Sequence, residues 1–483
     1  MRNITLFITL VAFYLSPAQT TVSKTIRQFG ARGDGRTNDH QAFLDAASFF
    51  NKRGGRGKLI IPKGTYIVGR QGQLANGSKD NHVLEFLNCR DLNIEGDNAV
   101  IKFASGLKFG SFDPSTGKPF HSPQAVFTDY TYAMPIGNFI QLVNCTNTSV
   151  KNIEVDGNSQ NFILGGKYGD VGFQLAHDGL LIKNSSSIVI QNIYVHHMGR
   201  DGVQLSNITP QEWQTADQKI VFKNCRFEYN GRQGFSWVGG SGLKMDNCKL
   251  SFTGRGKVSS PPGAGLDVEG EVGIIKNGNF SNCEFIDNTG SGIVADGGSS
   301  RGMNFEDCLL WGTTNWTVWT TKPQYHFNKC TFHGSIVHGY NSPDDENATV
   351  YDKCTFEDKD YKGRKSYGAF LAEINSVKRV RFTECKFVAN EKKLLWIVSD
   401  DAYRLEEMPM LEKCKFILKN KNLKYPDYWL KYYKVRLKDD EWYIPTELKN
   451  TDTYFVAGGE NILQGTNIWH YSDTDRKIVN KEK

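Results

Sequence analysis

Three arginines occupy the same position in three consecutive repeats in the middle of the chain. Arg200, Arg232 and Arg255 each follow a glycine, and the stretches around them align without a gap. If these repeats stack as parallel strands, equal positions lie about 4.8 Å apart and the guanidinium groups form a column. A guanidinium group binds a planar carboxylate or sulfate through two hydrogen bonds. We therefore expect the column to bind an anionic substrate, with a structural ladder of Arg–Asp pairs as the alternative.

Other polar residues extend this column. One repeat earlier, His177 takes the place of the arginine, and Asp178 and Asp201 occupy the next position of two successive repeats. Gln204 follows three residues after Asp201. We expect His177, Asp178 and Gln204 to bind substrate together with the arginines. Asp201 is a candidate catalytic residue.

Two residues suited to proton transfer, His197 and Tyr229, occupy equal positions in adjacent repeats. A neutral histidine accepts a proton near neutral pH, and a tyrosine delivers one. Positive charge on the nearby arginines would lower the pKa of Tyr229. An aromatic stack that only packs a corner of the fold is the structural alternative. We expect His197 and Tyr229 to act as base and acid, with His196 as the reserve.

A pair of carboxylates, Asp267 and Glu269, lies two residues apart in an apolar stretch. Residues two apart on a strand share one face, so both side chains are expected to point outward. Such a pair could catalyse glycoside hydrolysis, bind a sugar hydroxyl, pair with the arginines or hold a Ca²⁺ ion. The pattern establishes no cofactor, and it leaves Ca²⁺ as a candidate and the identity of any metal unknown.

The elements that must position these residues form a repeat marked by cysteine. Eight cysteines, 22–35 residues apart, are each followed two residues later by phenylalanine or leucine. Ile153 and Ile193 take the cysteine position in two earlier repeats. A position that accepts isoleucine or cysteine is buried and apolar, so a ladder of free thiols is expected rather than disulfides. The repeated cysteines are Cys225, Cys248, Cys283, Cys308, Cys330, Cys354, Cys385 and Cys414.

The repeat length and the alternation of inward apolar with outward polar residues predict an all-β solenoid with about three short strands per coil. Turns rich in Gly, Asn and Asp separate the strands. We expect coils over residues 83–418 and an N-terminal cap with the first strands over 19–82. Residues 419–483 lose the cysteine frame and are expected to form a C-terminal cap, with a wall beside the substrate groove or an oligomer contact as the alternative.

The N-terminal region carries a second pattern. Phe29–Asp39 is rich in glycine and aspartate, residues 41–47 have a helical pattern, and Gly57–Tyr66 reads as a strand and turn. This pattern resembles the opening of the pectate-lyase and polygalacturonase superfamily, although Asn38-Asp39 replaces the usual paired aspartates. The resemblance implies a right-handed parallel β-helix. It leaves the reaction open, because the superfamily holds lyases, hydrolases, epimerases and phage tailspikes.

The first 18 residues are typical of a signal peptide. Arg2 precedes an apolar run from Ile4 to Leu15, and Ala18 ends a stretch of small residues suited to cleavage. We therefore expect a secreted or periplasmic protein, and no later stretch is long enough to span a membrane. The net charge of +6 fits an anionic partner without arguing for one, and no nucleic-acid partner is expected. Oligomeric state is left open.

The arginine column, the histidines and the tyrosine together favour β-elimination. A lyase needs a positive clamp on a uronate carboxylate, a base for the acidic proton and an acid for the leaving group. We expect a polysaccharide lyase or uronate-oligosaccharide dehydratase that acts on a uronic-acid-containing, sulfated or unsulfated polysaccharide. One alternative is a glycoside hydrolase that uses Asp267 and Glu269, although the sequence lacks the usual signatures of the hydrolase branch. A second alternative is a C5-epimerase. A non-catalytic glycan-binding β-helix is the least favoured alternative.

Overall fold

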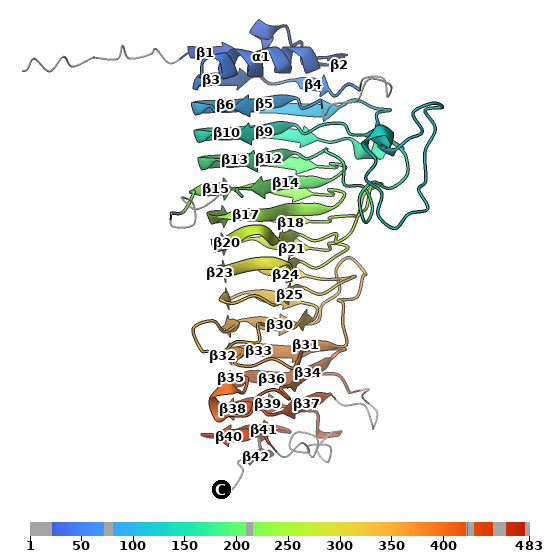
Figure 1. Cartoon of the computed structure of the whole chain (residues 1–483). Helices are drawn as coiled ribbons and strands as arrows, with labels where there is room; N and C mark the ends of the chain where they lie inside the picture. Colours follow the sequence, from blue (N-terminus) through green and yellow to red (C-terminus); the bar gives the residue numbers. More distant parts are fainter. Residues whose placement is uncertain are drawn as a thin grey trace, which may run out of the picture.

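Stacked parallel strands form about half of the chain and build its main body. The computed structural model describes residues 22–71, 81–208, 216–421, 423, 429–447 and 460–478. Within these residues, strands from β1 (Val22–Thr25) to β42 (Arg476–Ile478) join one continuous hydrogen-bonded ladder, and the molecule is an elongated solenoid (Figure 1). The predicted all-β parallel solenoid is confirmed. The predicted signal peptide lies outside the described residues.

Each central coil has three sides. In one coil, β13 (Ser186–His196) bends at Asn192, whose φ of 52° is left-handed, so that this strand covers two sides. After a short corner, β14 (Asp201–Ser206) covers the third side. In the coil before, β10 (Thr146–Asp156) pairs with β13 in parallel, so residues at equal positions lie one above another.

The strands of the coils around the site are β9 (Ile140–Val143), β12 (Leu180–Lys183), β15 (Ile220–Lys223), β16 (Arg226–Glu228), β17 (Gln233–Asp246), β18 (Lys249–Ser251), β19 (Leu266–Val268), β20 (Gly270–Ser281), β21 (Glu284–Ile286), β22 (Ile293–Ala295), β23 (Gly298–Glu306), β24 (Leu309–Trp311), β25 (Val318–Thr320) and β27 (Thr331–His333).

The cysteine frame lies inside the solenoid. All ten cysteines are free and buried, and Ile153 and Ile193 are 2% exposed in the same slot. The thiol of Cys225 donates to the carbonyl oxygen of Lys223 at 3.3 Å, so the sulfur is satisfied without a disulfide. The predicted thiol ladder is therefore confirmed.

The N-terminal end of the solenoid is closed by helix α1 (His40–Lys52), which extends beyond the predicted helical pattern at both ends. Its buried face includes Phe43 and Phe50, and it lies across the first coil (Figure 1). This helix covers apolar side chains and strand edges that an open solenoid would expose. None of the helices in the described ranges has the length and apolar character needed to cross a membrane.

The coils continue past the boundary expected at residue 418. Five further strands keep the parallel pairing. A sixth strand, β42, then pairs antiparallel with β41. Trp442 and Trp469 stack in register below Phe416, and Asp440 and Asn467 stand where the cysteine would be. Tryptophan replaces phenylalanine in the same inward slot, so the fold persists where the cysteine pattern ends. The five parallel strands are β37 (Leu430–Tyr433), β38 (Arg436–Lys438), β39 (Glu441–Tyr443), β40 (Ile462–Gln464) and β41 (Ile468–His470).

Long loops leave the solenoid beside the coils of its N-terminal half (Figure 1). Part of them forms a small sheet of β7 (Lys108–Ser111), β8 (Ala133–Met134) and β11 (Ile163–Leu164). The backbone N–H of Phe173 donates to Ser260 Oγ at 2.8 Å, which joins these loops to the insertion 256–263. The two segments therefore stand together over the third side of the solenoid.

Candidate active site

A cavity of about 510 Å³ lies over the third side, where β17, β19, β22 and β25 stack. The loop around Asp170 and the two prolines of the insertion form its walls. The cavity is lined by Asp170, Val171, Gln174, Arg232, Gln233, Pro261, Pro262, Asp267, Glu269, Ser291, Val294, Asp296, Asn315 and Trp319. Titratable groups at the floor of a walled cavity make this the leading candidate for chemistry.

Asp267 is a buried carboxyl group in the cavity. It is 1% exposed, and its neighbours in register are Ser236 and Val294 of the adjacent coils. Gln233 Nε2 donates to its Oδ2, whereas Oδ1 has no hydrogen-bond partner among the described residues. Burial, and next the charge of Glu269, raise the pKa of Asp267 well above its usual range. A carboxyl group in this environment holds its proton and can act as a general acid.

Two further carboxylates and an aromatic ring lie near Asp267. Glu269 follows β19, and Asp296 follows β22 in the next coil, so the two occupy corresponding positions. Trp319 lies two coils from Asp267 in the same outward column. The cavity thus combines a buried carboxyl group with a raised pKa, additional carboxylates and an aromatic surface on which a sugar ring can lie.

The arginines form ion pairs with aspartates. The guanidinium group of Arg200 contacts Asp178, and that of Arg232 contacts Asp201, each through two nitrogens. The side chains of both aspartates are 0% exposed, so each arginine compensates a buried charge. Gln204 accepts a hydrogen bond from Arg200 at 3.2 Å. Arg200 and Arg232 therefore form the Arg–Asp pairs of the structural alternative, and the expected binding of substrate by the three arginines stays a prediction.

Arg255 is paired in a different direction from the other two arginines. Its Nη2 lies 2.7 Å from Asp287 Oδ1, and the same nitrogen donates to Thr313 and Thr314. Arg200 and Arg232 pair with a preceding coil, whereas Arg255 pairs with the following one. The three arginines occupy equal positions in their repeats, but their guanidinium groups point in different directions. Each guanidinium group turns toward the aspartate with which it pairs.

His177 is a core residue, and its expected role in substrate binding is wrong. The ring is fully buried among Phe103, Phe109 and Phe162, and its Nδ1 accepts the N–H of Gly199 at 2.6 Å. Burial lowers the pKa of His177 to about 3, so the ring is neutral. A substrate has no access to it.

The predicted aromatic column exists at the corner between the second and third sides. The rings of His197 and Tyr229 stack at 5.2 Å with a 5° interplanar angle, and Tyr229 stacks on Phe252 at 4.8 Å. Burial lowers the pKa of His197 and raises that of Tyr229. The expectation of a lowered Tyr229 pKa is wrong, because burial and next the charge of Glu228 raise it. Among the described residues, the cavity lining does not include His196, His197 or Tyr229.

Several residues of the cavity are not among those predicted from the sequence. Asp170 and Gln174 come from a loop that no repeat pattern places, and Asp296 and Trp319 come from the next two coils. Extending the alternation of Leu266–Val268 by two coils would have put Trp319 in the outward column of Asp267. For the loop residues, no comparable signal exists in the sequence.

Residues 138–332 match the family model described as the right-handed β-helix region. The chain carries a right-handed β-helix region. The match includes the coils that form the floor of the cavity, and it confirms the right-handed parallel β-helix predicted from the sequence.

A curated relative matches about half of this chain. A probable polygalacturonase of Arabidopsis thaliana is 23% identical over 292 residues, which are 50% of this chain and 60% of that protein. This chain therefore spans less than two thirds of that curated relative. The resemblance to the pectate-lyase and polygalacturonase superfamily is confirmed.

Two solved structures are similar in shape. The A-module of a mannuronan C-5 epimerase of Azotobacter vinelandii has a TM-score of 0.42 and 13% identity, covering 86% of this chain and 95% of the module. A hyperthermoactive exopolygalacturonase of Thermotoga maritima has a TM-score of 0.33 and 12% identity, covering 95% of this chain and 94% of that one.

Proposed function

We propose that the β-helix is a glycoside hydrolase whose active site is the cavity over β17, β19, β22 and β25. The observation that carries the proposal is Asp267, a buried carboxyl group with a raised pKa beside the charge of Glu269. Glycoside hydrolysis uses two carboxyl groups whose environments separate their pKa values. Asp267 would protonate the glycosidic oxygen, and Glu269 would act as the base or nucleophile on the other side of the bond.

The charge of the cavity supports recognition of a neutral sugar ring at the cleaved bond. Asp170, Glu269 and Asp296 line the cavity together with Asp267, whereas the charge of Arg232 is balanced by Asp201. Like charges repel, so a uronate carboxylate would be disfavoured beside these groups. Carboxylates accept hydrogen bonds from sugar hydroxyls, which a neutral polysaccharide supplies. Export through residues 1–18 would place this activity outside the cytoplasm.

β-Elimination on an acidic polysaccharide is the second candidate. It is favoured by Arg232, the arginine that lines the cavity among the described residues. The polygalacturonase relative supports an acidic substrate, but not elimination as the reaction. For elimination, Arg232 would have to bind a substrate carboxylate while it remains bound to the buried Asp201. Its existing ion pair is the reason that we place elimination second.

The experiment measures product chemistry on a panel of neutral polysaccharides and polygalacturonate. We expect new reducing ends from a neutral glycan, without the ultraviolet absorbance of unsaturated uronates. Replacing Asp267 with Asn or Glu269 with Gln should lower kcat by roughly 10²–10⁴-fold, the usual share of acid–base catalysis. Thermal melts of both variants show whether the fold is retained.

The matched control is Asp97→Asn, which alters an exposed carboxylate on β6 (Arg90–Phe103) outside the cavity lining. Its turnover should equal that of the parent. Unsaturated products from polygalacturonate would establish elimination instead. Glycan binding without any product, in parent and variants alike, would contradict both reactions and favour a binding protein.

A further inference from the structure

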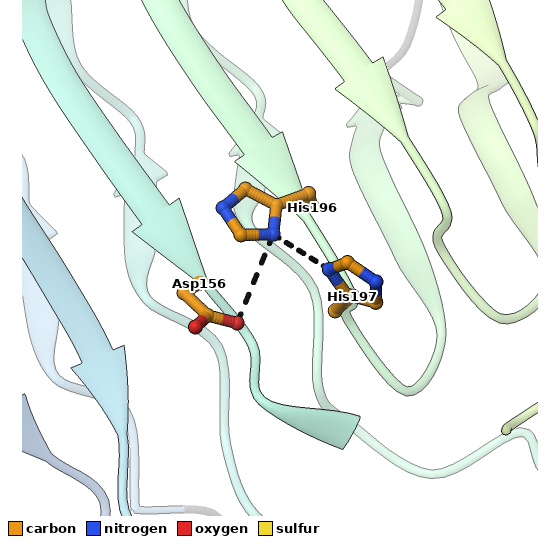
Figure 2. A group of neighbouring side chains, drawn as sticks. All are labelled: Asp156, His196 and His197. Atoms are coloured by element: carbon orange, nitrogen blue, oxygen red, sulfur yellow. Dashed lines mark hydrogen bonds and ion pairs between the residues drawn. The ribbon is translucent and has the colours of Figure 1, made fainter. Parts of the chain in front are cut away.

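Three side chains with metal-binding atoms converge at the ends of β10 and β13. They are Asp156, His196 and His197 (Figure 2), and their ligand atoms lie within 4.8 Å of one another. His196 Nδ1 is 2.7 Å from His197 Nδ1 and 3.7 Å from Asp156 Oδ1. Within the described ranges of the chain, no other group of three or more such residues meets this spacing.

The fold brings these residues together by two separate devices. Asp156 and His196 are partners in the register of β10 with β13, so they share an outward column of adjacent coils. His197 follows with a φ of 55°, in the left-handed region, and its ring lies beside that of His196. The stack with Tyr229 at 5.2 Å holds the His197 ring on its other side.

A second set of contacts holds the rings and the carboxylate in place. His196 Nε2 is 3.4 Å from Glu154 Oε1, opposite the nitrogen that faces His197. Lys102 Nζ lies 2.9 Å from Asp156 Oδ2, and the N–H of Asn158 donates to Asp156 Oδ1. Histidines that bind metals almost always bond their second nitrogen to a carboxylate or another acceptor, which sets the tautomer and the ring orientation. The Glu154–His196 contact supplies that arrangement.

We propose that Asp156, His196 and His197 bind one divalent transition-metal ion, with zinc as the best match. Imidazole nitrogens suit zinc, copper and nickel, whereas Ca²⁺ takes six to eight oxygen ligands. With two nitrogens and one oxygen, the cluster selects against Ca²⁺. Three protein ligands leave a coordination position for water or another small ligand. The site lies outside the cavity lining, so it does not rest on the proposed glycosidic activity.

The test uses the tag-free mature protein after chelator treatment and dialysis. Titration with Zn²⁺ alone should show one equivalent bound with release of heat, and Co²⁺ should give the visible absorption bands of a nitrogen-ligated ion. His197→Gln and Asp156→Asn should abolish the stoichiometric event. Glu154→Gln should weaken zinc binding by about 10–100-fold, as expected of an outer partner of a ligating histidine.

The matched control is His333→Gln. His333 is buried at the end of β27 in the same outward column, and its Nδ1 faces the carbonyl oxygen of Glu357 at 2.8 Å. This variant should bind zinc as the parent does. Absence of a stoichiometric zinc event in the parent, or its retention in both ligand variants, would overturn the proposal and leave a histidine pair that shares one proton. Catalytic assays are not needed, so failure here is distinct from failure of the hydrolase proposal.

Discussion

At the scale of single residues, the chemistry of Asp267 follows from where its strand places it. The side chain points outward from β19, yet the loops around Asp170 and Pro261 enclose the space in front of it. Loss of solvation is the first cause of its raised pKa, and the charge of Glu269 is the second. In the proposed reaction, this environment is what would make Asp267 a proton donor.

Activity should fall as the pH rises through the raised pKa of Asp267, because the acid form is the catalytic one. Gln233 donates to Asp267, and this hydrogen bond lowers the pKa, so Gln233→Leu should move the alkaline limb of kcat to higher pH. A pH profile of kcat, measured on the glycan that the product assay identifies, gives the position of the acid and alkaline limbs. An alkaline limb that stays in place in Gln233→Leu would contradict the assignment of Asp267 as the acid.

The same group should affect stability with a defined sign. The folded-state pKa is raised, so the contribution of the protonated carboxyl to stability is complete below the unfolded pKa and is lost as pH rises through the folded pKa. In Asp267→Asn, the free energy of unfolding should therefore decline less with rising pH. The difference is about 1.4 kcal/mol for each unit of pKa shift traversed. Urea unfolding over a pH series checks the slope, and equal slopes in parent and variant would contradict it.

At the scale of elements, the Arg–Asp pairs join neighbouring coils at the start of the third side. Asp178 lies just before β12 and Asp201 begins β14, and both are buried where strands of successive coils stack. Arg200 and Arg232 cover these charges from the outside, with 16% and 15% of their side chains exposed. The pairs therefore hold in place the corner at which β14 and β17 begin, and β17 contributes to the floor of the cavity.

Arg200→Ala should destabilise the fold by about 3–5 kcal/mol, because it leaves the buried charge of Asp178 without a partner. Urea denaturation measures the loss. The control Lys58→Ala removes a solvent-exposed pair with Glu95 and should change stability by at most about 1 kcal/mol. Wild-type stability in Arg200→Ala, combined with lost turnover of a uronate polymer, would restore the clamp that the sequence pattern suggested.

At the scale of the whole molecule, the solenoid is a stack in which each coil covers the apolar side chains of the previous one. The last coils are needed for this, since Trp442 stacks on Phe416 at 5.2 Å and Trp469 stacks on Trp442. Their removal would expose the core of the coil above and the hydrogen-bonding edges of its strands.

A chain that ends at Leu418 should therefore aggregate or melt at a lower temperature than the full chain. Light scattering and thermal melts measure both effects. A milder variant, Trp442→Ala, should cost about 3–5 kcal/mol through the cavity that it leaves. If the shortened chain stayed monomeric with an unchanged melting temperature, the coils after residue 418 would be dispensable for the stack.

The sequence by itself determined the architecture and much of the register. A β-helix repeats one inward pattern, so the cysteine slots, their isoleucine substitutes and the stacking of His197 on Tyr229 were all readable from spacing. The pattern failed after residue 418 because the inward slots admit tryptophan, aspartate and asparagine as well.

Tertiary structure decided what the outward residues do. Alignment places Arg200, Arg232 and His177 in one column. In the structure, Arg200 pairs with Asp178 and Arg232 pairs with Asp201, whereas His177 is buried among aromatic rings. Asp267 is a candidate acid only because the loop around Asp170, which is distant in sequence, and the neighbouring insertion 256–263 enclose it. Periodicity fixes the direction of a side chain, whereas burial, charge pairing and pKa depend on which segments meet around it, and a repeat does not encode those contacts.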